Sequence, residues 1–236
     1  MVQAHSGFKS PLRYHRDQRL LETCMDVLYL VRHGETEWNR QQRMQGRLDS
    51  RLTAEGRSHA REHGMLLARE AVEHLVVSPL GRTRETADLI LESCAAPVTY
   101  DERLVERDSG LWEGLTIDEI AARYPDEWAA RSLDPFHHRP PAGENLPDLL
   151  ERIVPLAEQL QAMPVRRLAI VSHGISGRAL LTHFLGLSPA EANRVRQPNA
   201  FVYRLVFSNG AVTCSHFRRG AGPHAGLFLH PRDLPA

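Results

Sequence analysis

The sequence has few cysteines and no long hydrophobic segment. Its three cysteines, Cys24, Cys94 and Cys214, lie far apart and form no C-x-x-C pair. This spacing argues against a disulfide scaffold or a zinc site and fits a reducing compartment, so we expect a cytoplasmic protein. No apolar run approaches the roughly 18 residues of a membrane-spanning helix, and the amino terminus lacks the apolar stretch of a signal peptide. We therefore expect neither export nor membrane anchoring.

An excess of charge of one sign is also lacking. The 236 residues include 29 basic and 29 acidic side chains, which gives a formal net charge of zero. Proteins that bind nucleic acid or a membrane surface usually carry a clustered basic face, so we expect neither partner. The length is sufficient for one large domain with an ample core. Strand-like and helix-like segments alternate along it, which predicts an α/β domain with a largely parallel sheet.

Two predicted strands end in a histidine that is followed by a glycine. The apolar run V-L-Y-L-V leads into Arg32-His33-Gly34, and the run Leu168–Ser172 leads into His173-Gly174. In open α/β sheets, ligands bind outside the carboxyl ends of the strands. We therefore predict that Arg32, His33 and His173 face one crevice, and that Gly34 allows a tight turn.

Local signals predict most of the remaining elements. We expect helices at 53–69, 78–91, 116–124, 145–161 and 175–185, strands at 74–77 and 98–100, and a hairpin of 201–207 with 211–217. His59 and His63 are four residues apart on the first of these helices, a spacing that can hold a metal ion. No third ligand is evident, so a solvated helical face is the favoured interpretation.

The sequence divides into a central domain and two terminal segments. Residues 1–24 are polar and aperiodic, and we expect them to be an extension upstream of a functional start at Met25. The predicted domain covers residues 25–217, and residues 218–236 are expected to form an irregular tail. Residues 126–144 fit either a lid over the crevice or plain connecting structure.

A phosphate site follows if Arg32, His33, Arg82 and His173 converge. Two guanidinium groups and two imidazoles suit a phosphate dianion better than a carbonyl or a sugar. Arginine charges lower the pKa of a neighbouring histidine, and the neutral imidazole is then a nucleophile toward phosphorus. Attack gives a phosphohistidine, and the leaving alkoxide needs a proton.

A carboxyl group in a loop could supply this proton. Glu106 is the candidate, because a partly desolvated carboxyl group beside a bound dianion tends to keep its proton. The same group could then accept a proton from the water that attacks the phosphohistidine. Glu113 stands close by in the sequence and is the rival on these grounds.

Four segments of the sequence carry the motifs of one family. In chain order they read L-V-R-H-G-E-T-E-W-N, S-P-L-G-R-T-R-E-T-A, L-V-E-R-D-S-G-L-W-E-G and V-S-H-G. Together they resemble the histidine phosphatase superfamily, the phosphoglycerate-mutase-like proteins, over about residues 27–207. The resemblance implies a three-layer α/β/α sandwich with a mostly parallel central sheet, a phosphohistidine intermediate, no metal and no cofactor.

The resemblance also implies roles for individual residues. It makes His33 the nucleophile and Glu106 the proton donor and acceptor, which favours Glu106 over Glu113. The phosphate-binding residues that it implies are Arg32, Asn39, Gln45, Gly46, Arg82, His173 and Gly174.

Three departures from the family pattern bear on substrate shape. Ser109 stands where relatives usually have a larger residue, Ile175 stands where glycine is common, and Ala142-Gly-Glu-Asn145 replaces Gly-Gly-Glu-Ser. We expect all three near the mouth of the pocket. Either an apolar pocket wall or the core can accommodate the aromatic residues Trp112, Trp128 and Phe136.

Three functions are compatible with this pattern. The acid loop Glu106-Arg-Asp-Ser-Gly and the short segment after it resemble the phosphatase-type branch, so we predict hydrolysis of small phosphomonoesters. Phosphoglycerate mutase activity is the alternative. A non-catalytic phosphoester-binding protein is the third interpretation, which is weak because every catalytic position is filled. The sequence does not choose the phosphomonoester, and the oligomeric state is open, with a homodimer as one option.

Overall fold

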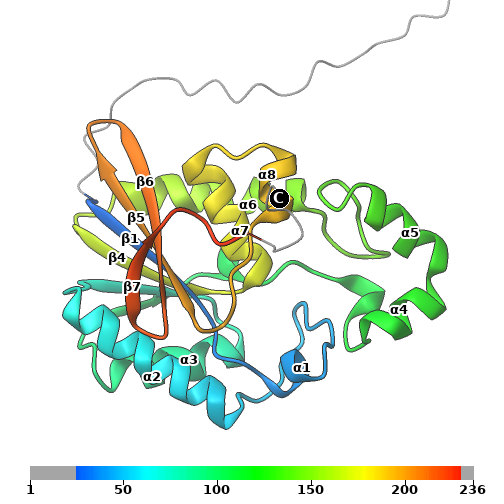
Figure 1. Cartoon of the computed structure of the whole chain (residues 1–236), viewed down its shortest axis with the longest axis horizontal. Helices are drawn as coiled ribbons and strands as arrows, with labels where there is room; N and C mark the ends of the chain where they lie inside the picture. The colour runs from blue at the N-terminus through cyan, green and yellow to red at the C-terminus, as the bar shows by residue number, and fades with distance from the viewer. Residues whose placement is uncertain (1–24, 230–236) are drawn as a thin grey trace, which may run out of the picture.

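The computed structural model describes residues 25–229. The predicted extension, residues 1–24, therefore lies outside the described residues, as do residues 230–236. The described chain forms the predicted α/β architecture (Figure 1).

A mixed sheet runs through the middle of the molecule in the order β3-β2-β4-β1-β5-β6-β7. The strands are β1 (Val27–Arg32), β2 (His74–Val77), β3 (Val98–Tyr100), β4 (Arg167–Ser172), β5 (Phe201–Ser208), β6 (Ala211–Arg218) and β7 (Ala221–Ala225). β3, β2, β4 and β1 pair in parallel, whereas β5, β6 and β7 are added antiparallel to the edge of β1. The prediction of a mostly parallel central sheet is confirmed for the strands that lead into the site.

Helices cover both faces of this sheet and extend beyond one of its ends. They are α1 (Glu37–Arg40), α2 (Ala54–Arg69), α3 (Gly81–Leu91), α4 (Ile117–Arg123), α5 (Pro125–Leu133), α6 (Leu146–Gln161), α7 (Gly174–Leu185) and α8 (Pro189–Arg194). α2 and α3 lie on one face, and α6 and α7 lie on the other (Figure 1). This arrangement is the predicted three-layer α/β/α sandwich.

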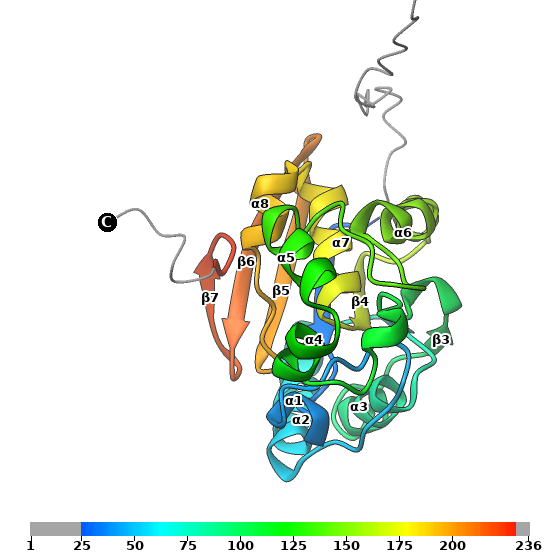
Figure 2. The same ribbon diagram turned by 90° about the vertical axis from the view of Figure 1, so that its right-hand side faces the viewer.

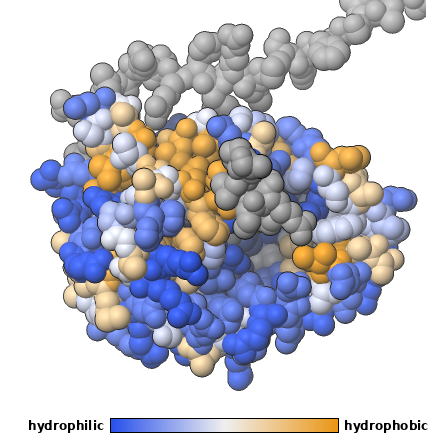
Figure 3. All heavy atoms as spheres, in the orientation of Figure 1, coloured by the Kyte–Doolittle hydropathy of each residue, from blue (hydrophilic) through white to orange (hydrophobic). Residues whose placement is uncertain are grey.

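The side chains of β1 alternate between the two faces of the sheet, which explains why helices cover both faces. Leu28 and Leu30 belong to the hydrophobic cluster under α6 and α7, whereas Val27, Tyr29 and Val31 belong to the cluster under α2 and α3. Successive side chains of a strand point to opposite faces, so a strand that is apolar throughout needs a helical layer on each side. The outward surface over α2 and α3 is mainly hydrophilic (Figure 3).

The pairing of β1 with β4 sets the position of the two histidines. Arg32 lies opposite Ser172 in the parallel register, and the backbone N–H of His33 donates to the carbonyl of Ser172 at 2.9 Å. Both strands end at the same edge, so His33 and His173 leave the sheet side by side. The helices α4 and α5 lie on the side of the molecule where these strands end (Figures 1 and 2).

The carboxyl-terminal part of the sheet corrects one prediction. The expected hairpin is confirmed, with Asn209 and Gly210 at positive φ in its turn, as a type I′ turn requires. The irregular tail predicted for residues 218–236 is wrong at its start, because β7 pairs with β6 and Phe228 packs against the core. Glycine and proline in this segment suggested a loop, but β7 is an exposed edge strand, where both residues are tolerated.

The start of α3 also differs from the prediction. The helix begins at Gly81 instead of at Pro79, and its N-cap Leu80 forms no side-chain cap. Asp49 supplies the cap from a distant loop, because its carboxylate accepts from the N–H groups of Gly81 at 2.7 Å and of Arg82 at 3.2 Å. A cap from another segment leaves no local sequence signal.

His59 and His63 do not form the solvated helical face that was expected. Both are buried on α2, and Nε2 of His63 lies 2.9 Å from the carbonyl oxygen of Asn199. His63 therefore ties α2 to the loop before β5. Among residues 25–229, no helix is long and apolar enough to cross a membrane.

The burial of His63 predicts an acid-sensitive fold. Burial lowers the pKa of His63 from its ordinary value of 6.5 to about 4. Between these values the unfolded chain binds the proton and the folded chain does not, so the free energy of unfolding falls as the pH falls. This one group contributes about 1.4 kcal/mol per pH unit at most.

Urea unfolding between about pH 7 and pH 4.5 tests this prediction. We expect the loss of stability to be shallower in His63→Asn than in the unmodified protein. Buried His33 and His173 act in the same direction, so some pH dependence remains. His224→Asn removes an exposed imidazole and is the matched control. Identical slopes for His63→Asn and the unmodified protein would contradict the assignment.

Candidate active site

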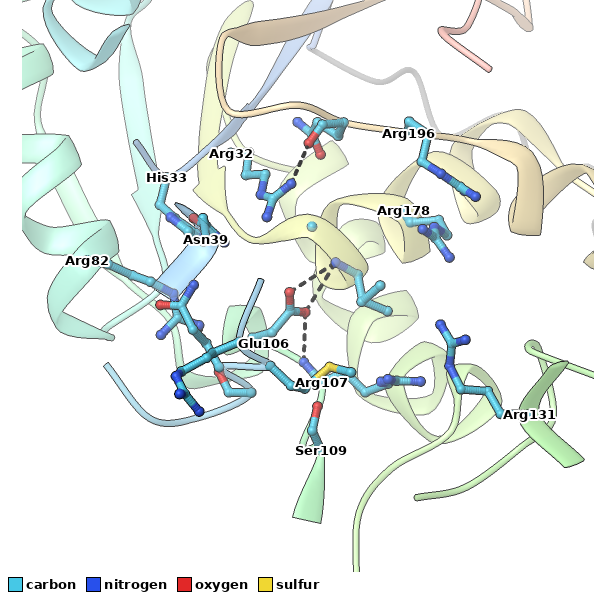
Figure 4. Close-up of a pocket in the computed structure, with 17 residues that line it drawn as sticks. Arg32, His33, Asn39, Arg82, Glu106, Arg107, Ser109, Arg131, Arg178 and Arg196 are labelled. Atoms are coloured by element: carbon cyan, nitrogen blue, oxygen red, sulfur yellow. Dashed lines mark hydrogen bonds between the residues drawn. The ribbon is translucent and has the colours of Figure 1, made fainter. Parts of the chain in front are cut away.

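A pocket of about 230 Å³ lies beyond the ends of β1 and β4. Its walls include residues from the end of β1, from the loop after α1, from the acid loop and from the start of α7 (Figure 4). The predicted site residues that line it are Arg32, His33, Asn39, Gln45, Gly46, Arg82, Glu106 and Gly174. His173 does not line the pocket and lies buried behind this wall.

His33 is held with one ring nitrogen available. Its Nδ1 lies 2.8 Å from the carbonyl oxygen of Gly34, so Nδ1–H donates there and Nε2 is the unprotonated nitrogen. The pKa of His33 is well below its usual value, because burial disfavours the imidazolium and Arg82 and Arg32 add like charge. Burial is the larger cause, whereas the sequence had suggested only the arginines.

Gly34 has a different role from the one predicted. It does not adopt the positive φ that only some turns require. A side chain here would collide with the backbone of Gly56 on α2, so glycine allows α2 to approach the end of β1. The N–H of Gly34 donates to Thr86 Oγ1 on α3 at 3.0 Å, which fixes the backbone next to His33 from the other helix.

His173 supports the site from inside the protein. Its ring centroid lies 5.3 Å from that of His33, its Nδ1 accepts from Arg82 Nε at 3.2 Å, and its Nε2 lies 2.7 Å from Ser78 Oγ. The pKa of His173 is also well below its usual value, first through burial and then through Arg82. Both ring nitrogens are therefore engaged by neighbours.

The two predicted arginines differ in how many donors they keep for a ligand. Arg82 uses four of its five N–H groups within the protein, on His173, Gly46, Leu48 and Asp49. Arg32 donates from one nitrogen to the carbonyl of Gln197 at 3.0 Å, and its buried Nε has no partner within residues 25–229. Arg32 is therefore the better equipped of the two to hold an anion.

Gly174 and Gly46 allow this packing. A side chain on Gly174 would press on the Arg32 guanidinium, with a Cβ only 3.3 Å from Cζ. Gly46 adopts a φ of +53°, and a side chain there would collide with the carboxylate of Glu113. Glu113 accepts from the N–H groups of Arg47 and Ser109, so the rival acid joins two loops and does not line the pocket.

Two amides lie in the wall between these groups. Gln45 is 7% exposed, and its Oε1 has no partner within the described chain. Asn39 forms a capping box with Thr36, which fixes its side chain at the start of α1. The unpaired atom of Gln45 is thus a hydrogen-bond acceptor, whereas the Asn39 oxygen already accepts from the N–H of Thr36.

Glu106 is fixed at the amino terminus of α7 (Figure 4). Its carboxylate accepts from the N–H groups of Arg107 at 2.8 Å, Ile175 at 3.1 Å and Ser176 at 3.1 Å. Backbone N–H groups in the first turn of a helix lack internal partners and attract negative charge. The carboxylate is therefore placed on the pocket wall by two segments at once.

Arg152 of α6 holds the backbone of the acid loop by hydrogen bonds. Its guanidinium donates to the carbonyls of Arg103, Val105 and Glu106. Glu144 pairs with Arg152 at 3.1 Å and accepts from the N–H of Asp108 at 2.9 Å. These bonds fix the backbone on both sides of the Glu106 carboxylate.

The three departures from the family pattern separate in space. Ser109 and Ile175 line the pocket, as expected. The segment 142–145 does not line it, and its Glu144 supports the acid loop instead. Ala142 adopts a φ of +59°, a conformation that favours glycine.

Aromatic residues do not form a wall of this pocket. Trp112 and Phe136 are buried, and neither they nor half-buried Trp128 line it. The core interpretation is thus correct for Trp112 and Phe136. The pocket instead contains seven arginines and a single carboxylate, Glu106.

Sequence reasoning missed several residues that shape the site. Ser78 follows the end of β2 directly, so the strand-end argument that found the histidines could have found it. Gln197 and Asn199 stand in a loop without a motif, yet Gln197 holds Arg32 and Asn199 donates to the carbonyl of His33 at 2.7 Å. Arg131 comes from α5, inside the segment for which a lid and a plain connection were both open.

This geometry defines a class of protein. A neutral imidazole, a guanidinium with donors left for a ligand and a fixed carboxylate face one small pocket, which suits acid–base chemistry on a phosphate ester. The chain belongs to the histidine phosphatase superfamily (branch 1), whose family model matches residues 28–219.

Comparison with individual proteins agrees with this family. "Probable phosphoglycerate mutase GpmB" of Citrobacter koseri is 37% identical over 182 residues, covering 76% of this chain and 84% of the relative. A mycobacterial glucosyl-3-phosphoglycerate phosphatase is 32% identical with a TM-score of 0.69, covering 76% and 89% of the two chains. The α-ribazole phosphatase of Shigella flexneri is 24% identical with a TM-score of 0.76, covering 83% and 98%, and shares the fold. The family and these relatives indicate a phosphatase or a mutase.

The contact between Ser78 and His173 predicts how loss of a buried hydrogen bond behind the pocket affects stability and turnover. Ser78→Ala leaves the Nε2–H of His173 without an acceptor, and an unsatisfied buried donor costs about 1–3 kcal/mol. We therefore expect a lower free energy of unfolding and a loss of kcat. Ser93→Ala, on an exposed residue, is the control. Unchanged stability and kcat in Ser78→Ala would show that the contact does not matter.

Proposed function

We propose that the protein is a phosphatase that hydrolyses small phosphomonoesters through a phosphohistidine on His33. The observation that carries the proposal is the state of this side chain, which is neutral, buried and fixed by Gly34 with Nε2 unprotonated. Nε2 attacks phosphorus, the bond to the ester oxygen breaks, and the phosphoryl group is transferred to the histidine. Arg32 neutralises the phosphoryl oxygens during this transfer.

Glu106 handles the protons in both steps. In its protonated form it gives a proton to the leaving ester oxygen. The resulting carboxylate then accepts a proton from the water that attacks the phosphohistidine, which breaks the P–N bond, releases phosphate and restores neutral His33. Its fixed position on the pocket wall supports this role, whereas Glu113 lies outside the pocket lining and accepts from two backbone N–H groups. His173 and Arg82 act as supports that keep His33 and the neighbouring loop in place.

A mutase is the second candidate, and the GpmB relatives favour it. A mutase returns the phosphoryl group to bound phosphoglycerate, whereas a phosphatase admits water to the phosphohistidine. We favour hydrolysis because the acid loop Glu106-Arg-Asp-Ser-Gly and the short segment after it resemble phosphatases. The mycobacterial phosphatase at 32% identity supports the same choice.

A paired assay separates the two candidates. Phosphate release from a panel of phosphomonoesters is measured beside conversion of 3-phosphoglycerate to 2-phosphoglycerate, primed with bisphosphoglycerate and with chelator in every reaction. We expect fast phosphate release that resists the chelator, without isomerisation. Efficient isomerisation with slow release would make the protein a mutase and would contradict hydrolysis.

The loss of activity on replacing Glu106 with a residue that cannot donate this proton should depend on the leaving group. In Glu106→Gln we expect a loss of about a hundredfold or more on alkyl phosphates, whose leaving oxygen needs a proton. The loss on p-nitrophenyl phosphate should be much smaller, because that leaving group is stable as an anion. Glu113→Gln is the matched control and should affect both substrates alike. Equal losses on both substrates in Glu106→Gln would point to another acid.

A further inference from the structure

Four arginines face one another in the outer part of the pocket, away from the reacting histidine. We call Arg107, Arg131, Arg178 and Arg196 the distal arginine cluster; they come from the acid loop, α5, α7 and the segment after α8. Figure 4 shows their guanidinium groups pointing toward a common space, with Glu106 between them and Arg82 in this view. Segments far apart in the sequence thus place four positive charges around one volume.

These guanidinium groups have no carboxylate partner within the described residues. Within residues 25–229 none of the four forms an ion pair, and the Nε atoms of Arg107 and Arg178 are buried without an acceptor. Arg131 lies over the ring of Trp128 at 4.8 Å, and Arg196 uses one nitrogen on the carbonyls of Asn193 and Val195. Most of the N–H donors in the cluster are therefore free.

The arrangement is costly without a ligand. Burial, followed by the like charges of Arg196 and Arg107, lowers the pKa of Arg178 to about 9. Burial also lowers the pKa of Arg131, again with Arg107 and Arg196 as like charges. The chain has as many acidic as basic residues, yet the pocket wall here holds only Glu106. A bound anion offsets the desolvation cost of unpaired charges in such a place.

We propose that the distal arginine cluster binds a second phosphate group, so that the substrate is a small molecule with a phosphate at each end. This inference rests on the proposed function, because the other phosphate is the one that His33 attacks. Arg32 serves the reacting phosphate, whereas the cluster serves the distal one.

The number of donors favours phosphate over carboxylate at the distal end. A carboxylate has one negative charge and two oxygens in a plane, which one guanidinium can satisfy. A phosphate dianion has two charges and three terminal oxygens in different directions, which suits guanidinium groups that approach from four segments. Arg107 is only 7% exposed, so it is not an ordinary solvated surface arginine.

A matched set of substrates tests the distal site. The set comprises the monophosphate and the bisphosphate of the same α,ω-alkanediol, and the ω-carboxyalkyl phosphate of equal length, for several chain lengths. We expect kcat/KM for the best bisphosphate to exceed that for its monophosphate by about tenfold or more. No preference for the bisphosphate, or a preference for the carboxylate, would overturn the proposal.

Variants then link the preference to the cluster. In Arg131→Gln and Arg178→Gln the ratio of the two kcat/KM values should fall by about tenfold. Arg218→Gln removes the same charge from an exposed position on β6 and should leave the ratio unchanged. The ratio is insensitive to a general loss of folded enzyme. An unchanged ratio in both pocket variants would contradict the assignment.

Binding to His33→Ala keeps the test independent of turnover. Calorimetry on this variant should show the bisphosphate bound about tenfold more tightly than the monophosphate, with the difference lost when Arg178→Gln is added. Equal affinities would overturn the distal site. Absence of phosphate release from every substrate, including p-nitrophenyl phosphate, would instead refute the proposed hydrolysis, while the calorimetry would still decide the distal site.

Discussion

The in-register pairing of β1 with β4 is the constraint on which the site depends. It brings His33 and His173 out of the sheet at the same edge, with ring centroids 5.3 Å apart. A shift by one residue would turn each side chain to the opposite face of the sheet. The covered faces of β1 make such a shift expensive, since its apolar side chains are divided between two hydrophobic clusters. The core of the protein thus fixes the geometry of its chemistry.

Burial then determines the state of the groups that the sheet brings together. The low pKa of His33 arises first from desolvation and then from Arg82 and Arg32, so its imidazole is neutral without a separate base. The same burial limits what Arg82 can do, because most of its donors hold protein atoms. The pocket therefore combines a rigid inner wall with arginines that keep donors for a ligand. Glu106 lies on this wall, anchored to the first turn of α7.

The sequence predicts those parts of the fold and site that depend on local signals. Strand ends located Arg32, His33 and His173, and the N-G pair located the turn between β5 and β6. Features that depend on distant contacts were not predictable in this way. Asp49 caps α3 from another loop, and Arg131 reaches the pocket only because α5 packs beyond the sheet. Their positions follow from tertiary packing, which no short motif records.

A direct test of the central claim is to trap the covalent intermediate. The enzyme is mixed with p-nitrophenyl phosphate, quenched in alkali within the first turnover, digested and analysed by mass spectrometry. We expect one phosphoryl group on the peptide that contains His33, stable to alkali and lost in acid, and absent in His33→Ala. A phosphoryl group on another residue, or turnover in which no phosphorylated peptide forms, would contradict nucleophilic catalysis by His33.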